Sequence, residues 1–124
     1  MLGILIGAIA TATLNSLWHQ RAAYPRGLMN VMQHSLRAAR QNAQSGQCVS
    51  TSHQHTLSLL KNLFEEIEPA FLPPSTQDPV FHRYVEDLQN ALARATAPST
   101  DCAKAIIALT DTANACEACH RDYR

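Results

Sequence analysis

The sequence predicts an all-α protein, an antiparallel up-down-up-down bundle of four helices. Two observations lead to this prediction. Apolar residues recur every three or four positions over four segments, and no segment alternates apolar and polar residues as a strand would. The connections between the segments are short, which favours antiparallel neighbours. The 124 residues, 46% of them hydrophobic, are enough for one domain with a single core.

The first 13 residues are apolar and small, and we separate them from a four-helix domain in residues 14–124. They are similar to the hydrophobic region of a secretory signal, although no basic residue precedes them. The run is shorter than a usual membrane span. We expect an export signal or an N-terminal apolar extension, with membrane contact only if the segment is retained. The alternative is a buried first helical turn.

The first two amphipathic helices lie between Pro25 and residue 71. Pro25 is placed where a helix would start or kink, and Ser45-Gly46 stops the first helix. Thr51 or Ser52 is expected to cap the second helix. Pro69 should disturb the last turn of that helix.

The third and fourth helices have clear starting signals. Asp78-Pro79 is a cap followed by proline, and Thr100 or Asp101 caps the last helix. The predicted core positions of the four helices are Leu28, Met29, Met32, Leu36, Ala39, Ala43, Thr56, Leu60, Leu63, Phe64, Ile67, Phe71, Phe81, Tyr84, Val85, Leu88, Leu92, Ala95, Cys102, Ala105, Ile106, Leu109, Ala113, Cys116, His120 and Tyr123.

The formal net charge is zero, but the charges are unevenly distributed. Residues 1–61 contain five basic residues and no acid, and all ten acids lie in the remainder. The arginines are scattered and aromatic residues are few, so we expect no nucleic-acid surface. The basic half could still dock an acidic partner weakly.

Near the C-terminus the chain contains the motif C-x-x-C-H, from Cys116 to His120. This spacing is the attachment signature of a c-type haem, in which two thiols bond to the haem and the following His binds its iron. We therefore predict one covalent haem c on Cys116 and Cys119, with His120 as the proximal iron ligand. The alternatives are a redox dithiol, which usually accompanies a βαβ pattern, and half of a zinc site, which needs two more ligands.

The predicted topology gives the bundle two distinct ends. Met29 near the start of the first helix shares one end with His120, and Cys48 shares the other end with Cys102. Haem c is attached outside the cytoplasm in bacteria, so we expect a periplasmic protein. Spare thiols of exported proteins usually pair, so Cys48 and Cys102 are expected to form a disulfide. The alternative is two separate buried cysteines acting as small hydrophobic residues.

Over residues 21–124 the chain resembles the class II c-type cytochromes, the cytochrome c-prime family. Residues 116–124 are similar to the family ending, in which an aromatic and a basic residue follow the His. Arg26-Gly27-Leu28-Met29 is similar to the first-helix segment that faces the iron, and residues 71–75 to the Phe-Pro loop after the second helix. The chain departs from the family at Pro25, where an Arg is common, and at Val80-Phe81, where a Trp is common.

The resemblance implies further haem-pocket residues. Met29 is the best candidate for the distal side, either bound to iron or only lining the pocket, and Met32 is the second candidate. Arg26 is a weaker candidate because it is displaced by one position from the family arginine. Arg124 could stack near the proximal side or could be a frayed terminal residue. His34 should face solvent, and His19, His53, His55 and His82 are interpreted as surface or capping residues.

These features predict a monohaem electron carrier, and no enzymatic constellation accompanies the motif. The expected partner is a redox protein, and a homodimer through the first two helices is possible. The alternative is a five-coordinate haem protein that binds nitric oxide or carbon monoxide. The state of Met29 separates the two functions, because a bound thioether closes the sixth iron position.

Overall fold

The structure, a computed structural model, describes residues 2–98 and 100–123; in residues 2–22 it describes the backbone and only a few side chains. Within these residues the fold is all-helical, as predicted, and contains no strand. The helices are α1 (Leu2–Gln44), α2 (Thr51–Glu65), α3 (Ile67–Phe71), α4 (Pro79–Thr96) and α5 (Cys102–Asp122).

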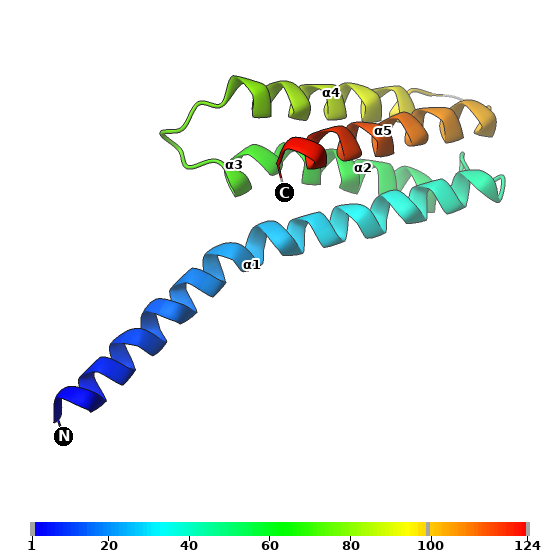
Figure 1. Ribbon diagram of the computed structural model, residues 1–124. Helices are drawn as coiled ribbons and strands as arrows, with labels where there is room; N and C mark the ends of the chain where they lie inside the picture. The colour runs from blue at the N-terminus through cyan, green and yellow to red at the C-terminus, as the bar shows by residue number, and fades with distance from the viewer. Residues whose placement is uncertain (1, 99, 124) are drawn as a thin grey trace.

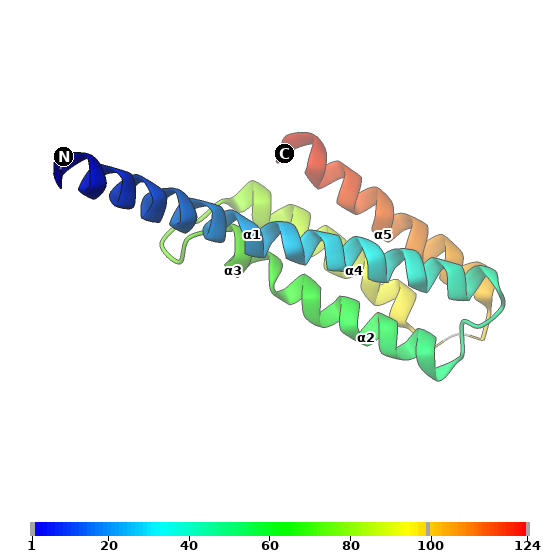
Figure 2. The ribbon, with the colours of Figure 1, turned by 90° about the horizontal axis from the view of Figure 1, so that it is seen from below.

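Four long helices lie side by side, and the chain reverses direction between one and the next (Figure 1). The C-terminal part of α1 packs against α2 and α5, and α4 packs against the same two helices. The short α3 lies at the turn between α2 and α4. The N-terminal part of α1 extends beyond the other helices, which Figure 2 shows from a second direction.

The first helix does not begin near Pro25, so of the two outcomes expected there, a helix start or a kink, the start is wrong. α1 is continuous from Leu2 to Gln44 and includes Pro25 in its interior. Proline removes one backbone hydrogen bond from a helix, and here the helix continues on both sides of it. The proposed boundary between residues 13 and 14 therefore falls inside a helix, and the export role of residues 1–13 stays a prediction.

The bounds of α2 also differ from the prediction at both ends. Ser50, rather than Thr51 or Ser52, caps the helix, because its hydroxyl accepts a 3.1 Å hydrogen bond from the His53 N–H. The helix ends at Glu65, and a separate short helix contains Pro69. Pro69 has no N–H to donate to the carbonyl of Glu65, four residues earlier. The break between α2 and α3 therefore follows Glu65.

The starts of α4 and α5 agree with the sequence analysis. The Asp78 carboxylate accepts hydrogen bonds of 3.0 Å from the N–H groups of Val80 and Phe81, and Pro79 is the first helical residue. Asp101, one of the two predicted caps, accepts a 3.0 Å hydrogen bond from the Ala103 N–H. Both carboxylates also lie at the positive ends of their helix dipoles.

The core runs through α1, α2, α4 and α5. Half of the predicted positions are buried and most of the others are half-buried, but His120 is exposed and Phe71 is 39% exposed, and Leu57, absent from the prediction, is 2% exposed. Thr56 lies at the edge of the core and donates its hydroxyl to the Ser52 carbonyl, which leaves the inward position to Leu57. The buried apolar residues are Leu28, Met32, Ala39, Ala43, Cys48, Leu57, Leu60, Phe64, Ile67, Phe81, Val85, Leu88, Ala91, Leu92, Ala95, Ala108 and Leu109.

His53 is buried, whereas the sequence analysis interpreted it as a surface or capping residue. Its side chain is 1% exposed, and its Nδ1 atom has no hydrogen-bond partner among the residues that the structure describes. Burial lowers the pKa of His53, since the charged imidazolium is disfavoured away from water. His34, His55 and His82 are exposed, as expected. The side chain of His19 lies outside the described part.

Cys48 and Cys102 form the expected disulfide. Their Cα atoms are 5.4 Å apart, although the residues are 54 positions apart in sequence. The bond joins the loop after α1 to the first residue of α5. We call this part of the molecule the disulfide end, comprising Cys48, Ser50, His53, Asp101 and Cys102.

Candidate cofactor site

The C-x-x-C-H motif occupies the last turns of α5. Cys119 and His120 follow Cys116 by three and four positions, so the three residues lie on one face of the helix. Both cysteines are free thiols and are half-buried, whereas His120 is exposed. The motif is thus part of a helix that packs on α1 and α4, with its His at the solvent boundary.

A cavity of about 910 Å³ lies beside the motif. We call it the motif cavity. Its volume is within the range of about 300–1,000 Å³ that is typical of ligand and cofactor sites. It is lined by residues of all five helices, namely Met29, Asn30, Met32, Gln33, Leu36, Arg37, Arg40, Gln41, Gln44, Phe64, Ile67, Phe71, Phe81, Tyr84, Val85, Leu88, Ala113, Cys116, Glu117, Cys119, His120 and Tyr123.

The structure brings together five of the residues that the sequence singled out. Cys116, Cys119 and His120 line the motif cavity from α5, and Met29 and Met32 line it from α1. Met32 is 6% exposed, whereas Met29 is only half-buried. A planar group attached to the two cysteines would therefore meet a wall that carries two thioethers.

The two predicted arginines do not join this group. Arg26 is exposed and does not line the motif cavity, although it lies on the same helix as Met29. The shift of this residue by one position, noted in the sequence, turns it about 100° around the helix from the family position. Arg124 lies outside the described residues.

The walls of the motif cavity differ in polarity. The contributions of α2, α3 and α4 are mainly apolar, and Phe64 and Val85 among them are 1% and 5% exposed. The α1 wall adds amides and two guanidinium groups from Gln33, Arg37 and Arg40 to its methionines. An amphipathic ligand with an apolar ring system and charged substituents matches this division.

Aromatic contacts fix the end of α5 against the start of α4. Tyr123 makes an edge-to-face contact with Phe81 at a centroid distance of 5.1 Å, and its hydroxyl donates a 2.9 Å hydrogen bond to Asp78. Tyr84 donates to Asp122 over 2.5 Å. Because Asp78 also caps α4, one carboxylate connects the two helices beside the motif. These contacts hold the motif helix in register without using the thiols.

The electrostatics of the thiols argue against a reactive redox dithiol. Burial, followed by the charge of Cys119, raises the pKa of Cys116 to about 11. Burial, followed by the charge of Asp122, also raises the pKa of Cys119. Redox-active dithiols instead have a thiol whose pKa is lowered by positive charge or a helix N-terminus. Here both thiols lie near a helix C-terminus and are neutral at physiological pH.

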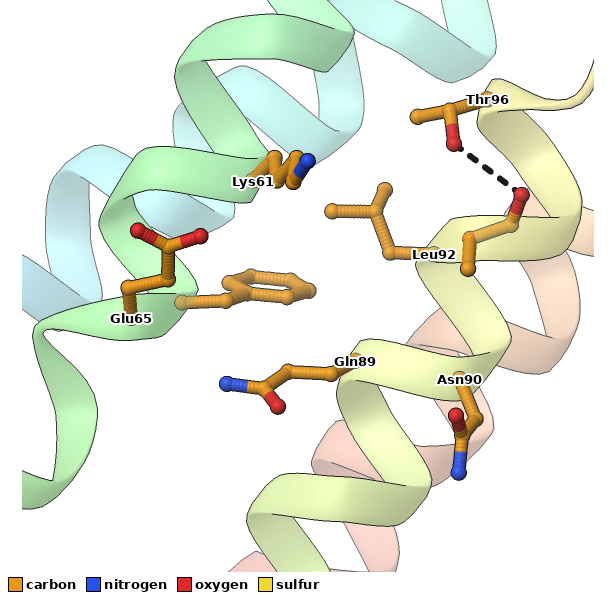
Figure 3. A pocket seen from close by; sticks show the side chains of 8 residues that line it. Lys61, Glu65, Gln89, Asn90, Leu92 and Thr96 are labelled. Carbon is orange, nitrogen blue, oxygen red and sulfur yellow. Dashed lines mark hydrogen bonds between the residues drawn. The ribbon is translucent and has the colours of Figure 1, made fainter.

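A second, smaller cavity of about 310 Å³ lies between α2 and α4. Figure 3 shows Lys61 and Glu65 from α2 facing Gln89, Leu92 and other residues of α4. The buried ring of Phe64 lines both cavities and so separates them. The smaller cavity contains no residue that the sequence analysis proposed as functional.

Neither known protein families nor curated proteins nor solved structures give a match to this chain. Among the residues that the structure describes, no three His, Cys, Asp or Glu side chains form a group that could hold a metal ion. Over the same described part, no helix is long and apolar enough to cross a membrane.

Sequence reasoning did not predict the polar α1 wall or the role of Asp78 beside the motif. Arg37 and Arg40 are not among the predicted core positions of the first helix. In the structure they border the motif cavity because the cavity extends along α1 past the methionines to Gln44. The spacing of Tyr123, four residues after Cys119, placed it among the predicted core positions, but no local signal in the sequence pairs it with Asp78.

Proposed function

We propose that the protein is a monohaem c-type cytochrome that transfers electrons in the bacterial periplasm, with a four-helix bundle as its scaffold. One observation carries the proposal: both cysteines and the histidine of a C-x-x-C-H motif line a single cofactor-sized cavity. A motif of five residues can occur by chance, but a chance motif would have no reason to border a cavity of this volume.

The residues around the motif cavity are compatible with a covalent haem. Cys116 and Cys119 would hold it through thioether bonds, and His120 would bind the iron from the same helix. Bound haem supplies a one-electron iron couple, whose potential depends on the axial ligands and on the polarity of the pocket. The apolar side chains of α2, α3 and α4 would cover the porphyrin and exclude water from it.

The α1 wall supports electron transfer as the role. Met29 is half-buried and lines the cavity, so its thioether is available as a second axial ligand, and a methionine ligand raises the potential. His120, which we propose as the proximal ligand, is exposed, so the bound iron would lie close to the surface. A short path between iron and solvent suits exchange of electrons with another protein.

The test is covalent haem retention. The full chain is produced in a bacterium that attaches haem c and is separated by denaturing gel electrophoresis. We expect haem staining of the polypeptide, complete loss of staining in Cys116→Ser/Cys119→Ser, and normal staining in the matched control Cys48→Ser/Cys102→Ser. An unaltered chain that loses its haem under denaturing conditions would contradict the proposal.

The absorption spectrum of the same sample separates electron transfer from gas binding. A low-spin ferric spectrum with a weak sulfur-to-iron band in the red indicates that Met29 binds iron and supports the electron carrier. A high-spin spectrum, together with tight nitric oxide binding and slow electron exchange, would instead support the gas-binding alternative.

A further inference from the structure

Three arginines form a stripe along α1. At 100° per residue, Arg37 lies within about 20° of Arg26 around the helix, and Arg40 within about 40° on the other side. We call Arg26, Arg37 and Arg40 the arginine stripe. Arg26 and Arg37 are exposed and Arg40 is half-buried. Because residues 1–61 contain no acid, α1 itself offers no carboxylate to neutralise the stripe.

The stripe is also unpaired in three dimensions. Within the described residues, no carboxylate lies within ion-pair distance of these three guanidinium groups. Two basic residues elsewhere do lie near a carboxylate: Arg94 lies 3.7 Å from Asp111, and Lys104 lies 3.9 Å from Asp101. The three guanidinium groups of the stripe therefore share one side of a single helix, whereas Lys61, Arg83 and Arg121, which also lack a carboxylate within ion-pair distance among the described residues, lie on three different helices.

The stripe borders the site of the proposed chemistry. Arg37 and Arg40 line the motif cavity, together with the thiols of Cys116 and Cys119. Glu117, on the α5 side, is the acidic residue among those that line this cavity. A protein that binds over Arg37 and Arg40 would sit directly beside the cofactor.

We propose that the arginine stripe is the docking surface for a redox partner protein that presents a cluster of carboxylates. The inference rests on the proposed function and adds the charge of the partner and the place where it binds. Opposite charges accelerate encounter and orient the two proteins, and the effect weakens as salt is added. Such contacts suit a carrier, because rapid association must be followed by rapid release.

The probe is a gold electrode coated with a carboxylate-terminated monolayer, with an ammonium-terminated monolayer for comparison. Adsorption of the full chain is measured first, since it reports docking whether or not haem is attached. The rate of electron exchange is then measured by voltammetry on the haem-bearing protein. Absence of covalent haem would contradict the proposed function, whereas the adsorption data alone decide the docking proposal in that case.

The variant Arg37→Gln/Arg40→Gln should lower both adsorption and exchange rate on the carboxylate surface by about tenfold or more at low salt. The difference should shrink towards about 0.5 M salt, where charges are screened over a few ångström. The matched control Lys61→Gln/Arg83→Gln removes the same charge from exposed positions on α2 and α4 and should behave like the unaltered protein. Glu117→Gln should increase both quantities.

Equal losses in the control and the stripe variant would overturn the proposal, because net charge alone would then explain them. Unchanged adsorption of the stripe variant would overturn it as well. Sedimentation gives a further outcome: a dimer that dissociates only in the stripe variant would identify the stripe as an interface between copies of this chain, and the partner proposal would be wrong.

Discussion

At one end of the molecule a disulfide joins two segments of the chain, while the opposite end carries the free thiols that line a cavity of about 910 Å³. Cys48 and Cys102 are bonded, His53 is 1% exposed, and Ser50 and Asp101 cap the adjoining helices. We call the other region, around Met29, Cys116 and His120, the cavity end. There the two thiols are free and half-buried, and the last helical histidine is exposed.

The difference follows from the side chains that face inward on α5 and α1. The α5 wall of the motif cavity contains small residues such as Ala113 and Cys116, which fill little volume. The middle of the molecule is filled by larger side chains such as Leu60, Phe64 and Leu109, each at most 1% exposed. The comparison teaches that one chain can specify a finished core at one end and a binding wall at the other. Three predictions test it, beginning with the largest effect.

Removing the disulfide should weaken the disulfide end strongly. The bond joins residues 54 positions apart, and the chain-entropy estimate for such a loop is about 4 kcal/mol. We expect the free energy of unfolding in urea to fall by this amount in Cys48→Ser/Cys102→Ser. Reductant should lower the stability of the unaltered protein but not that of the variant. A loss below about 1 kcal/mol would show that the disulfide end is held together mainly by packing.

Truncation of one side chain in each region should sharpen the contrast. Leu57→Ala opens a void in the filled core and should lower the free energy of unfolding in urea by about 2–5 kcal/mol. Met32→Ala only enlarges an existing cavity, so in haem-free protein its loss should lie near the lower limit of that range. In haem-bearing protein the cost of Met32→Ala should rise, because its contacts would then be complete. Equal costs for Met32→Ala in both forms would contradict the placement of the cofactor against α1.

The smallest expected effect is the pH dependence of the disulfide end. Burial lowers the pKa of His53 below its usual 6.5, so the unfolded chain binds more protons than the folded chain as pH falls through this range. Stability should therefore decrease on acidification from about pH 7.5 to about pH 5.5. His53→Gln should remove this slope in thermal unfolding.

The exposed His82 provides a control of opposite sign. Its hydrogen bond and charge interaction with Glu68 raise its pKa, so its contribution is present below the usual 6.5 and is lost as pH rises through the folded value. His82→Gln should thus affect the alkaline side of the profile. The loss of stability on acidification is assigned to His53. This assignment would be contradicted if His82→Gln reduced that loss and His53→Gln did not.

Much of the fold could be predicted because the local signals agree with the final structure. The Asp78-Pro79 start of α4 and the Asp101 cap of α5 depend on side chains adjacent to the backbone groups they satisfy. Pro25 was misleading, because the penalty of one proline does not outweigh the helical residues on both sides of it. Local sequence cannot express that balance.

The candidate site was only partly predictable for a related reason. The spacing of Cys116, Cys119 and His120 is local, and the position of Met29 follows from helix periodicity and the resemblance. The burial of His53 and the place of Arg40 beside the cavity depend on how α1, α2 and α5 pack together. No short segment contains that information, so the sequence analysis predicted a surface or capping position for His53 and no role for Arg40.

The Cys48–Cys102 bond also makes a covalent ring of α2, α3 and α4, from which α1 and α5 leave as two tails. Met29 lies on one tail and His120 on the other, while the ring supplies the apolar wall of the motif cavity from α2, α3 and α4. A single backbone cut anywhere between residues 49 and 101 opens the ring but leaves both tails joined through sulfur. Until a reductant is added, a chain nicked in this way remains one molecule that still carries every residue of the candidate site.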